Sequence, residues 1–131
     1  VAIKQWAQTA PQPQVQQMLW SNPRLVFFRE EDVPATGDGP RGAQGVPLTA
    51  GRSIAVDPGS IPYGVPVWLL SQGADTLNRL VVAQDTGSAI RGAVRADFYA
   101  GSGDAAGVYA NRIKQPLWLW VLWPKNSPVP H

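Results

Sequence analysis

The feature that most constrains this chain is the frequent interruption of its apolar runs by proline and glycine. The chain has 13 Gly and 13 Pro in 131 residues, which favours short strands over long helices. Six runs have the length and the β-branched or aromatic content of strands. They span residues 24–29, 53–57, 65–70, 79–84, 93–99 and 117–123.

Helical spacing of apolar residues occurs near the start and late in the chain. Within residues 1–20 this spacing is interrupted by Pro11 and Pro13, which predicts two short helices, and residues 103–114 predict one more. The length suits a single domain with a real core. The sequence therefore predicts a mainly β fold, and a small closed barrel in particular, because closure removes exposed sheet edges.

Two of the runs carry further expectations. Residues 79–84 are almost continuously apolar, so we expect a strand buried on both faces that ends directly before Asp85. Residues 117–123 contain Trp118, Trp120 and Trp123 and are apolar on both strand faces. This run should lie centrally in a sheet or against another domain, and its tryptophans are expected in the core rather than on a sugar-stacking platform.

Composition excludes several kinds of chemistry. There is no cysteine, and the single histidine is the terminal His131, so thiol nucleophiles, Ser-His-Asp triads and His or Cys metal sites are not expected. The net charge is +2 and the basic residues are scattered, which argues against nucleic acid as a partner. No apolar window is long enough to span a membrane, and the first residues do not form a signal peptide. Catalysis would therefore fall to carboxylates.

Residues 83–104 place three aspartates among glycines directly after an apolar run. They are Asp85, Asp97 and Asp104. Taken alone, each would be interpreted as a turn residue, because aspartate readily bonds its own neighbouring backbone. The surrounding blocks of sequence decide between that interpretation and a catalytic one.

Four ordered blocks resemble the three-aspartate, or "3D", domain of the membrane-bound lytic transglycosylase A family. The family's three aspartates match Asp57, Asp85 and Asp97. Two flanking segments, 22–30 (NPRLVFFRE) and 114–122 (KQPLWLWVL), also resemble that family's barrel, so the likeness covers nearly the whole chain. The four blocks are 46–58 (VPLTAGRSIAVDP), 61–64 (IPYG), 82–92 (VAQDTGSAIRG) and 94–107 (VRADFYAGSGDAAG).

This resemblance implies a six-stranded double-psi β-barrel with short peripheral helices. Residues 1–22 would be a helical lead-in, 23–124 the barrel and 125–131 a tail. Family members also carry an earlier barrel segment and an inserted second domain. The chain is therefore expected to be the C-terminal 3D part of a larger enzyme, with those segments as partners. The implied location is the periplasmic face of the Gram-negative outer membrane, as a lipoprotein or a secreted protein.

The implied activity is that of a lytic murein transglycosylase, with peptidoglycan glycan strands as the partner. Such an enzyme cleaves the β-1,4 bond between N-acetylmuramic acid and N-acetylglucosamine and leaves a 1,6-anhydromuramic acid end. No cofactor, metal or nucleic acid is implied. The substrate's own C6 hydroxyl is the nucleophile, and well-oriented intramolecular attack has effective molarities of about 10⁵ M or more. One carboxyl can then serve as acid and later as base.

The candidate site residues follow from this chemistry and from the family motif. Histidine and cysteine are excluded and no glutamate lies near the motif, so an aspartate must be the acid and base, and motif position selects Asp97. A free aspartate titrates near ~3.9, so an acid at neutral pH needs burial or a like charge, which Asp85 is expected to supply.

The remaining motif positions are given supporting roles. Asp57 is expected to have a structural role in a turn. Asp104 is expected to cap the following helix or to place a negative charge at its start. The family usually has glycine where Ser88 stands, which is a departure at that turn. Substrate-binding residues are expected at Gln84, Thr86, Gly87, Ala89 and Tyr99.

Two other functions remain open from the sequence. The first is a glycan-binding 3D barrel module that docks on the cell wall without cleaving it. The second is a barrel hydrolase that acts on another polysaccharide, such as chitin or a plant cell-wall polymer. The products formed from peptidoglycan distinguish all three, since only the transglycosylase requires a free C6 hydroxyl.

Overall fold

The computed structural model describes residues 2–23, 27, 30, 39–73 and 75–129. The chain divides into two compact units, Val1–Asp32 and Val33–His131. The first unit contains α1 (Ala2–Thr9) and α2 (Gln12–Trp20), which confirms the prediction of two short helices. Pro11 is the N-cap of α2, where its missing N–H costs no helical hydrogen bond.

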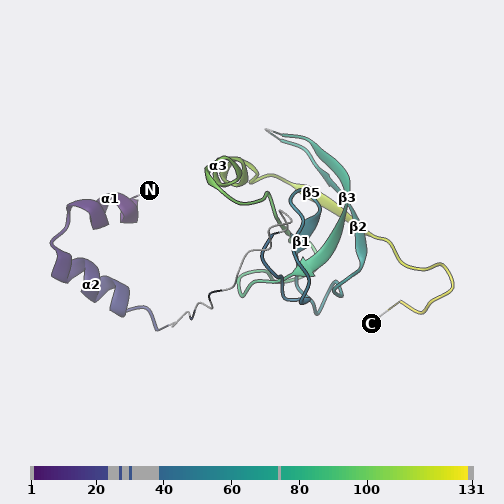
Figure 1. Ribbon diagram of the computed structural model, residues 1–131, viewed down its shortest axis with the longest axis horizontal. Coiled ribbons are helices and arrows are strands. Elements are labelled where there is room, and N and C mark those ends of the chain that lie inside the picture. Colours follow the sequence, from purple (N-terminus) through teal and green to yellow (C-terminus); the bar gives the residue numbers. More distant parts are fainter. Residues whose placement is uncertain (1, 24–26, 28–29, 31–38, 74, 130–131) are drawn as a thin grey trace. The chain divides into compact units, whose positions relative to one another are not determined.

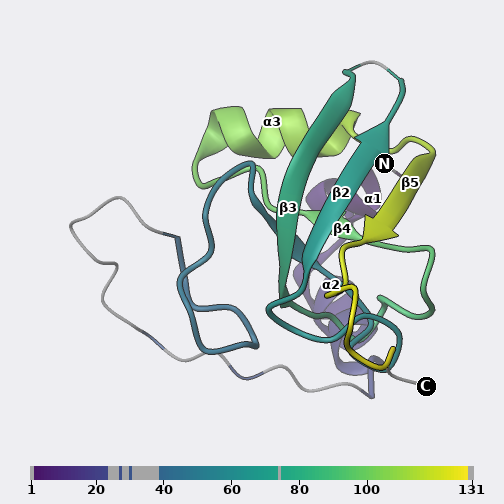
Figure 2. The ribbon, with the colours of Figure 1, turned by 90° about the vertical axis from the view of Figure 1, so that its right-hand side faces the viewer.

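The second unit is built on one curled sheet in the order β4-β1-β3-β2-β5. Figures 1 and 2 show the long β2 and β3 as a twisted hairpin, with β5 beside β2. Among the strands that the structure describes, β1 and β3 are parallel neighbours and the other three pairs are antiparallel. The strands are β1 (Ser53–Ala55), β2 (Pro66–Ser71), β3 (Leu77–Asp85), β4 (Asp97–Phe98) and β5 (Leu117–Val121), with helix α3 (Asp104–Arg112) between β4 and β5.

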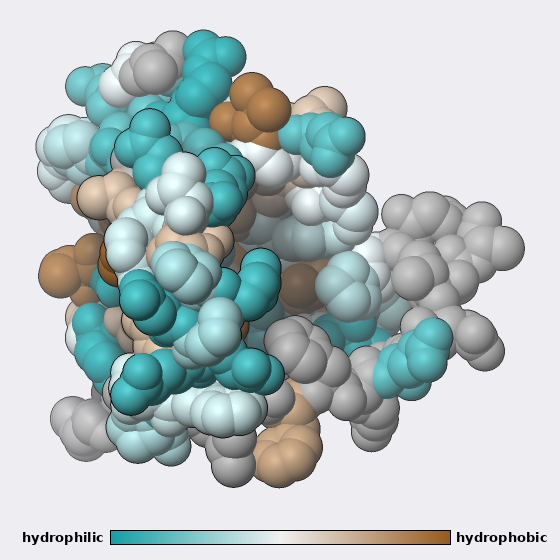
Figure 3. Space-filling model, turned by 90° about the vertical axis from the view of Figure 1, so that its left-hand side faces the viewer, coloured by the Kyte–Doolittle hydropathy of each residue, from teal (hydrophilic) through white to brown (hydrophobic). Residues whose placement is uncertain are grey.

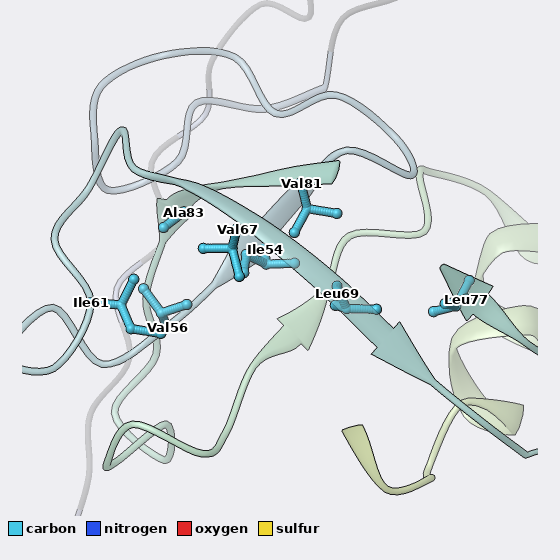
Figure 4. Packing of buried hydrophobic residues seen from close by; sticks show 8 residues of the cluster. All are labelled: Ile54, Val56, Ile61, Val67, Leu69, Leu77, Val81 and Ala83. Carbon is cyan, nitrogen blue, oxygen red and sulfur yellow. The ribbon is translucent and has the colours of Figure 1, made fainter. Parts of the chain in front are cut away.

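The core lies on one face of this sheet. Strand side chains alternate between faces, so Val67 and Leu69 of β2 are buried while Trp68 between them is 42% exposed. Figure 4 shows how the buried side chains from β1, β2, β3 and the turn after β1 gather together. The cluster is Ile54, Val56, Ile61, Val67, Leu69, Leu77, Val81 and Ala83.

The mainly β class is confirmed, but the described sheet is open. Five strands are present in the described residues, and β4 and β5 form its two edges. The strand predicted at residues 24–29 falls almost entirely outside the described residues, and Phe27 is not in a strand. A closed, six-stranded barrel therefore stays a prediction.

Three strand predictions need correction. The strand expected at residues 93–99 is only Asp97–Phe98, because residues 92–94 turn and β1 offers pairing only at Ile54 and Ala55. β3 is not buried on both faces, since its burial alternates and Leu80 is 40% exposed. β5 lies at an edge of the described sheet, so the central position expected for it is wrong, and the alternative position against another domain stays a prediction.

Because β5 is an edge strand, its side chains differ in burial. Leu119 packs against the core, whereas Trp118 and Trp120 are 48% and 49% exposed. These two tryptophans therefore lie outside the core of the described sheet, and their contact with another domain stays a prediction. Trp120 is the register partner of Trp68 on β2.

On the face drawn in Figure 3, hydrophobic side chains form separate patches among hydrophilic ones. Among the described helices, none is long and apolar enough to cross a membrane.

Candidate functional site

Strand pairing brings Asp85 and Asp97 to the same end of the sheet. Asp85 is the last residue of β3, Asp97 is the first residue of β4, and both have Ala55 of β1 as their register partner. Neighbouring strands lie ~4.8 Å apart, so the two Cα atoms are separated by about 10 Å across β1. Strand pairing thus brings together two residues that are twelve positions apart in the sequence.

Asp85 and Asp97 both line one cavity of about 410 Å³. Its walls come from β1, from the end of β3 with the loop that follows, and from β4. The cavity includes most of the residues predicted to bind substrate, but not Gln84. Those included are Thr86, Gly87, Ala89 and Tyr99.

Asp85 also forms a hydrogen bond with the segment 39–48. Its Oδ1 accepts a hydrogen bond from the Ala43 N–H at 2.9 Å, and the neighbouring Gln84 carbonyl accepts one from the Gln44 N–H at 3.1 Å. Gly42 makes this approach possible, because an added Cβ would collide with the Gln84 carbonyl oxygen. The carboxylate of Asp85 is therefore held in place at the rim of the cavity.

Asp97 is the more exposed of the two aspartates. Its side chain is 55% exposed, and its Oδ1 accepts a hydrogen bond from Arg95 Nε at 3.3 Å. Arg95 Nη1 also donates to the Ala89 carbonyl at 2.7 Å. Sequence reasoning overlooked Arg95, although the signal was available, because residues two apart in an extended segment share a face.

Asp57 is engaged with backbone on both oxygens. Oδ1 accepts from the Gly59 N–H at 3.0 Å, and Oδ2 accepts from the Gly92 N–H at 2.7 Å. These two bonds, that of Gly92 first, together with the nearby charge of Arg91, hold the pKa of Asp57 below its usual value of 3.8. Asp57 thus ties the turn after β1 to the loop between β3 and β4.

Gln84 lies in a buried network rather than in the cavity. The hydroxyl of Ser53, which is fully buried, donates to Gln84 Oε1 at 2.6 Å and accepts from the Thr49 N–H at 2.8 Å. Because Gln84 precedes Asp85 directly, this network fixes the end of β3. These hydrogen bonds suit a role for Gln84 in positioning Asp85 more than a role in contacting a ligand.

The other motif residues have the following surroundings. The Thr86 hydroxyl donates to the Val56 carbonyl at 2.8 Å, and Tyr99 Oη shares a hydrogen bond with Ser102 Oγ at 3.1 Å. Ser88 has no positive φ, so serine replaces glycine there without backbone strain. Asp104 begins α3 but makes no capping hydrogen bond, since Gly103 is the N-cap, and its charge alone suits the helix start.

Asp97 also borders a second cavity of about 630 Å³. Arg95, Lys114 and Gln115 supply its polar lining, and Leu69, Leu77 and Phe98 part of its apolar wall. Within the described part of the chain, no cluster of three or more His, Cys, Asp or Glu side chains could hold a metal ion. The smaller cavity thus has two carboxylate residues, Asp85 and Asp97. Asp97 is accessible and lies beside the cation of Arg95.

The described part of the chain is mainly β, and Asp85 and Asp97 lie at the ends of strands that pair with the same strand. Residues 52–123 match the 3D domain, and the chain belongs to the 3D domain family. More particularly, the chain is similar to membrane-bound lytic murein transglycosylase A of Vibrio cholerae, with 34% identity over 98% of this chain and 36% of that relative.

Solved structures agree with this likeness. The lytic transglycosylase LtgG of Burkholderia pseudomallei is 53% identical, with a TM-score of 0.67 over 95% of this chain and 37% of its own. MltA from Neisseria gonorrhoeae is 40% identical, with a TM-score of 0.79 over 96% of this chain and 32% of its own. E. coli MltA with bound chitohexaose is 31% identical, with a TM-score of 0.71 over 91% of this chain and 37% of its own. The resemblance expected from the sequence is confirmed, and the chain spans about a third of the length of these proteins.

Proposed function

We propose that this chain forms the catalytic part of a lytic murein transglycosylase. The enzyme would cleave the β-1,4 bond between N-acetylmuramic acid and N-acetylglucosamine and form a 1,6-anhydromuramic acid end. The observation that carries this proposal is that Asp85 and Asp97 border one cavity in a chain of the 3D domain family. The relatives named as lytic transglycosylases supply the reaction class.

Asp97 acts as the single acid and base. Its carboxyl proton passes to the glycosidic oxygen as the C1–O bond breaks, and the bonding electrons leave with the N-acetylglucosamine oxygen. The C6 hydroxyl oxygen of the same muramic acid then bonds to C1, and its proton returns to Asp97. Atoms and charges balance without water, and the intramolecular attack benefits from effective molarities of about 10⁵ M or more.

Asp85 stabilises the positive charge that develops on the sugar ring. It borders the same cavity and stands across β1 from Asp97, and a fixed carboxylate is suited to this role. Thr86, Gly87, Ala89 and Tyr99 form the wall against which the sugar binds. Gln84 keeps Asp85 in place through Ser53, and Asp57 and Asp104 remain structural.

The substrate site is completed by polypeptide outside this chain. The relatives are about three times as long, and the described sheet ends in the unpaired edges of β4 and β5. The strand predicted at residues 24–29, which lies almost entirely outside the described residues, would be the sixth strand of the double-psi barrel. A second domain would cover the exposed Asp97. We place the protein at the periplasmic face of the Gram-negative outer membrane, as the name of the relatives and the murein substrate suggest.

Mass spectrometry of murein digested by the full-length protein that carries this chain tests the proposal. The parent protein should release muropeptides that end in anhydromuramic acid, and Asp97→Asn should lower turnover by about 10²–10⁴-fold while chitohexaose binding persists. Asp104→Asn is the matched control, because it removes an exposed carboxylate from the start of α3. Reducing ends that carry added water would indicate a hydrolase, and binding to murein without release would indicate a glycan-binding module.

A further inference from the structure

Arg95 connects the beginning and the end of the loop between β3 and β4. Its Nη1 donates to the Ala89 carbonyl at 2.7 Å, and its Nε donates to Asp97 Oδ1 at 3.3 Å. A planar guanidinium can hold two acceptors at fixed angles, which a lysine ammonium on a flexible stem does less well. One oxygen of Asp97 is therefore engaged by a cation that is itself anchored to the loop.

The charges around Asp97 differ between its two sides. The cavity on one side includes Asp85 and Tyr99, and the cavity on the other side includes Arg95 and Lys114. These four are the titratable groups that line the two cavities with Asp97. Asp97 thus borders one cavity with a second carboxylate residue and another cavity with two cationic residues.

We propose that Arg95 is a positioning residue for the acid and base Asp97. Arg95 holds Oδ1, so that Oδ2 is the oxygen that presents the proton to the glycosidic bond. When that proton has left, the guanidinium stabilises the carboxylate until the C6 hydroxyl proton returns. This inference rests on the proposed transglycosylase function and adds to it a residue that orients the reacting carboxyl.

The exposure of the pair makes the inference testable. The side chains of Arg95 and Asp97 are 48% and 55% exposed. Such exposed ion pairs contribute little to folding stability, so replacing Arg95 should leave the fold intact. A loss of activity would then report on the orientation of Asp97 rather than on unfolding.

The experiment compares Arg95→Gln and Arg95→Lys with Arg91→Gln in the full-length protein. Arg91 is an exposed arginine of the same loop and supplies the matched control. Arg95→Gln should lower kcat on murein by about 10²-fold with KM unchanged, as expected for a misplaced catalytic group. Arg95→Lys should recover part of the loss.

A second measurement is independent of turnover. The chemical shift of the Arg95 Nε–H group should change in Asp97→Ala but not in Asp104→Asn, because that group donates to Asp97 Oδ1. An unchanged shift in Asp97→Ala, or a kcat of Arg95→Gln within about 2-fold of Arg91→Gln, would overturn the inference. Absence of anhydro products from the parent protein would instead refute the proposed function, and the Arg95 Nε–H signal would still decide whether Arg95 engages Asp97.

Discussion

Replacing Ser53 by alanine should destabilise the sheet more than its small change in volume suggests. Ser53 is fully buried in β1, and its hydroxyl bonds both Thr49 N–H and Gln84 Oε1. In Ser53→Ala both partners lose their hydrogen bond at a partly buried position. Alanine keeps the Cβ of serine and lacks only the hydroxyl oxygen, so the loss of these two bonds is the dominant effect.

The magnitude follows from the cost of leaving polar groups unpaired. One buried donor or acceptor without a partner costs about 1–3 kcal/mol, and both partners here are only partly buried. We therefore expect Ser53→Ala to lower the free energy of unfolding by about 2–4 kcal/mol. With a urea m-value of about 2 kcal/mol/M, the unfolding midpoint should fall by about 1–2 M.

Urea unfolding followed by tryptophan fluorescence measures this effect. The control is Ser60→Ala, which removes a hydroxyl from an exposed position of the turn after β1. A cycle with Gln84→Ala should give a coupling energy of about 0.5–3 kcal/mol between Ser53 and Gln84. If Ser53→Ala unfolds within about 0.5 kcal/mol of Ser60→Ala, the range for exposed substitutions, the network does not stabilise the end of β3.

Three further predictions follow from the described contacts. Asp85→Asn should keep an acceptor oxygen for segment 39–48 but lose the charge, so the turnover of murein by the full-length protein should fall while the urea midpoint changes little. Asp85→Ala should lower both the turnover and the urea midpoint. The pKa of Asp57 is lowered by its backbone bonds, so its contribution to stability is complete above 3.8 and is lost as the pH falls below that value. Asp57→Asn should therefore flatten the acid end of a plot of urea midpoint against pH, and an unchanged slope would contradict this assignment. Gly42→Ala should destabilise the chain because its Cβ meets β3, whereas Gly107→Ala, in an open position of α3, should raise the free energy of unfolding by about 0.5–1 kcal/mol. Equal urea midpoints for the two glycine variants would refute the close contact at Gly42.

Much of the fold could be predicted from local pattern. The strands β1, β2, β3 and β5 and the helix α3 occur where short apolar runs rich in β-branched or aromatic residues and helical spacing predict them. Local pattern also has limits, because it cannot distinguish a central strand from an edge strand. The run 117–123 is apolar on both faces, yet β5 pairs only with β2, and Trp118 and Trp120 are left exposed.

Part of the candidate site could also be anticipated. Excluding histidine, cysteine and nearby glutamate left aspartate as the acid, and the ordered motif blocks selected Asp97 and Asp85. Arg95 was overlooked because the motif drew attention to acids, although its spacing to Asp97 places both on one face. Gln84 was expected in the substrate wall, but its bond to a buried serine 31 residues away could not be inferred from either neighbourhood.

The sequence by itself determined which residues are available for chemistry and which short segments become strands, because both depend on residue type and local spacing. Only the tertiary structure decided which of these residues meet. Asp85 and Asp97 face one cavity because both strands pair with Ala55, and the exposed Asp97 has Arg95 as its partner. Register and long-range pairing depend on the packing of the whole sheet, and no single stretch of sequence contains that information.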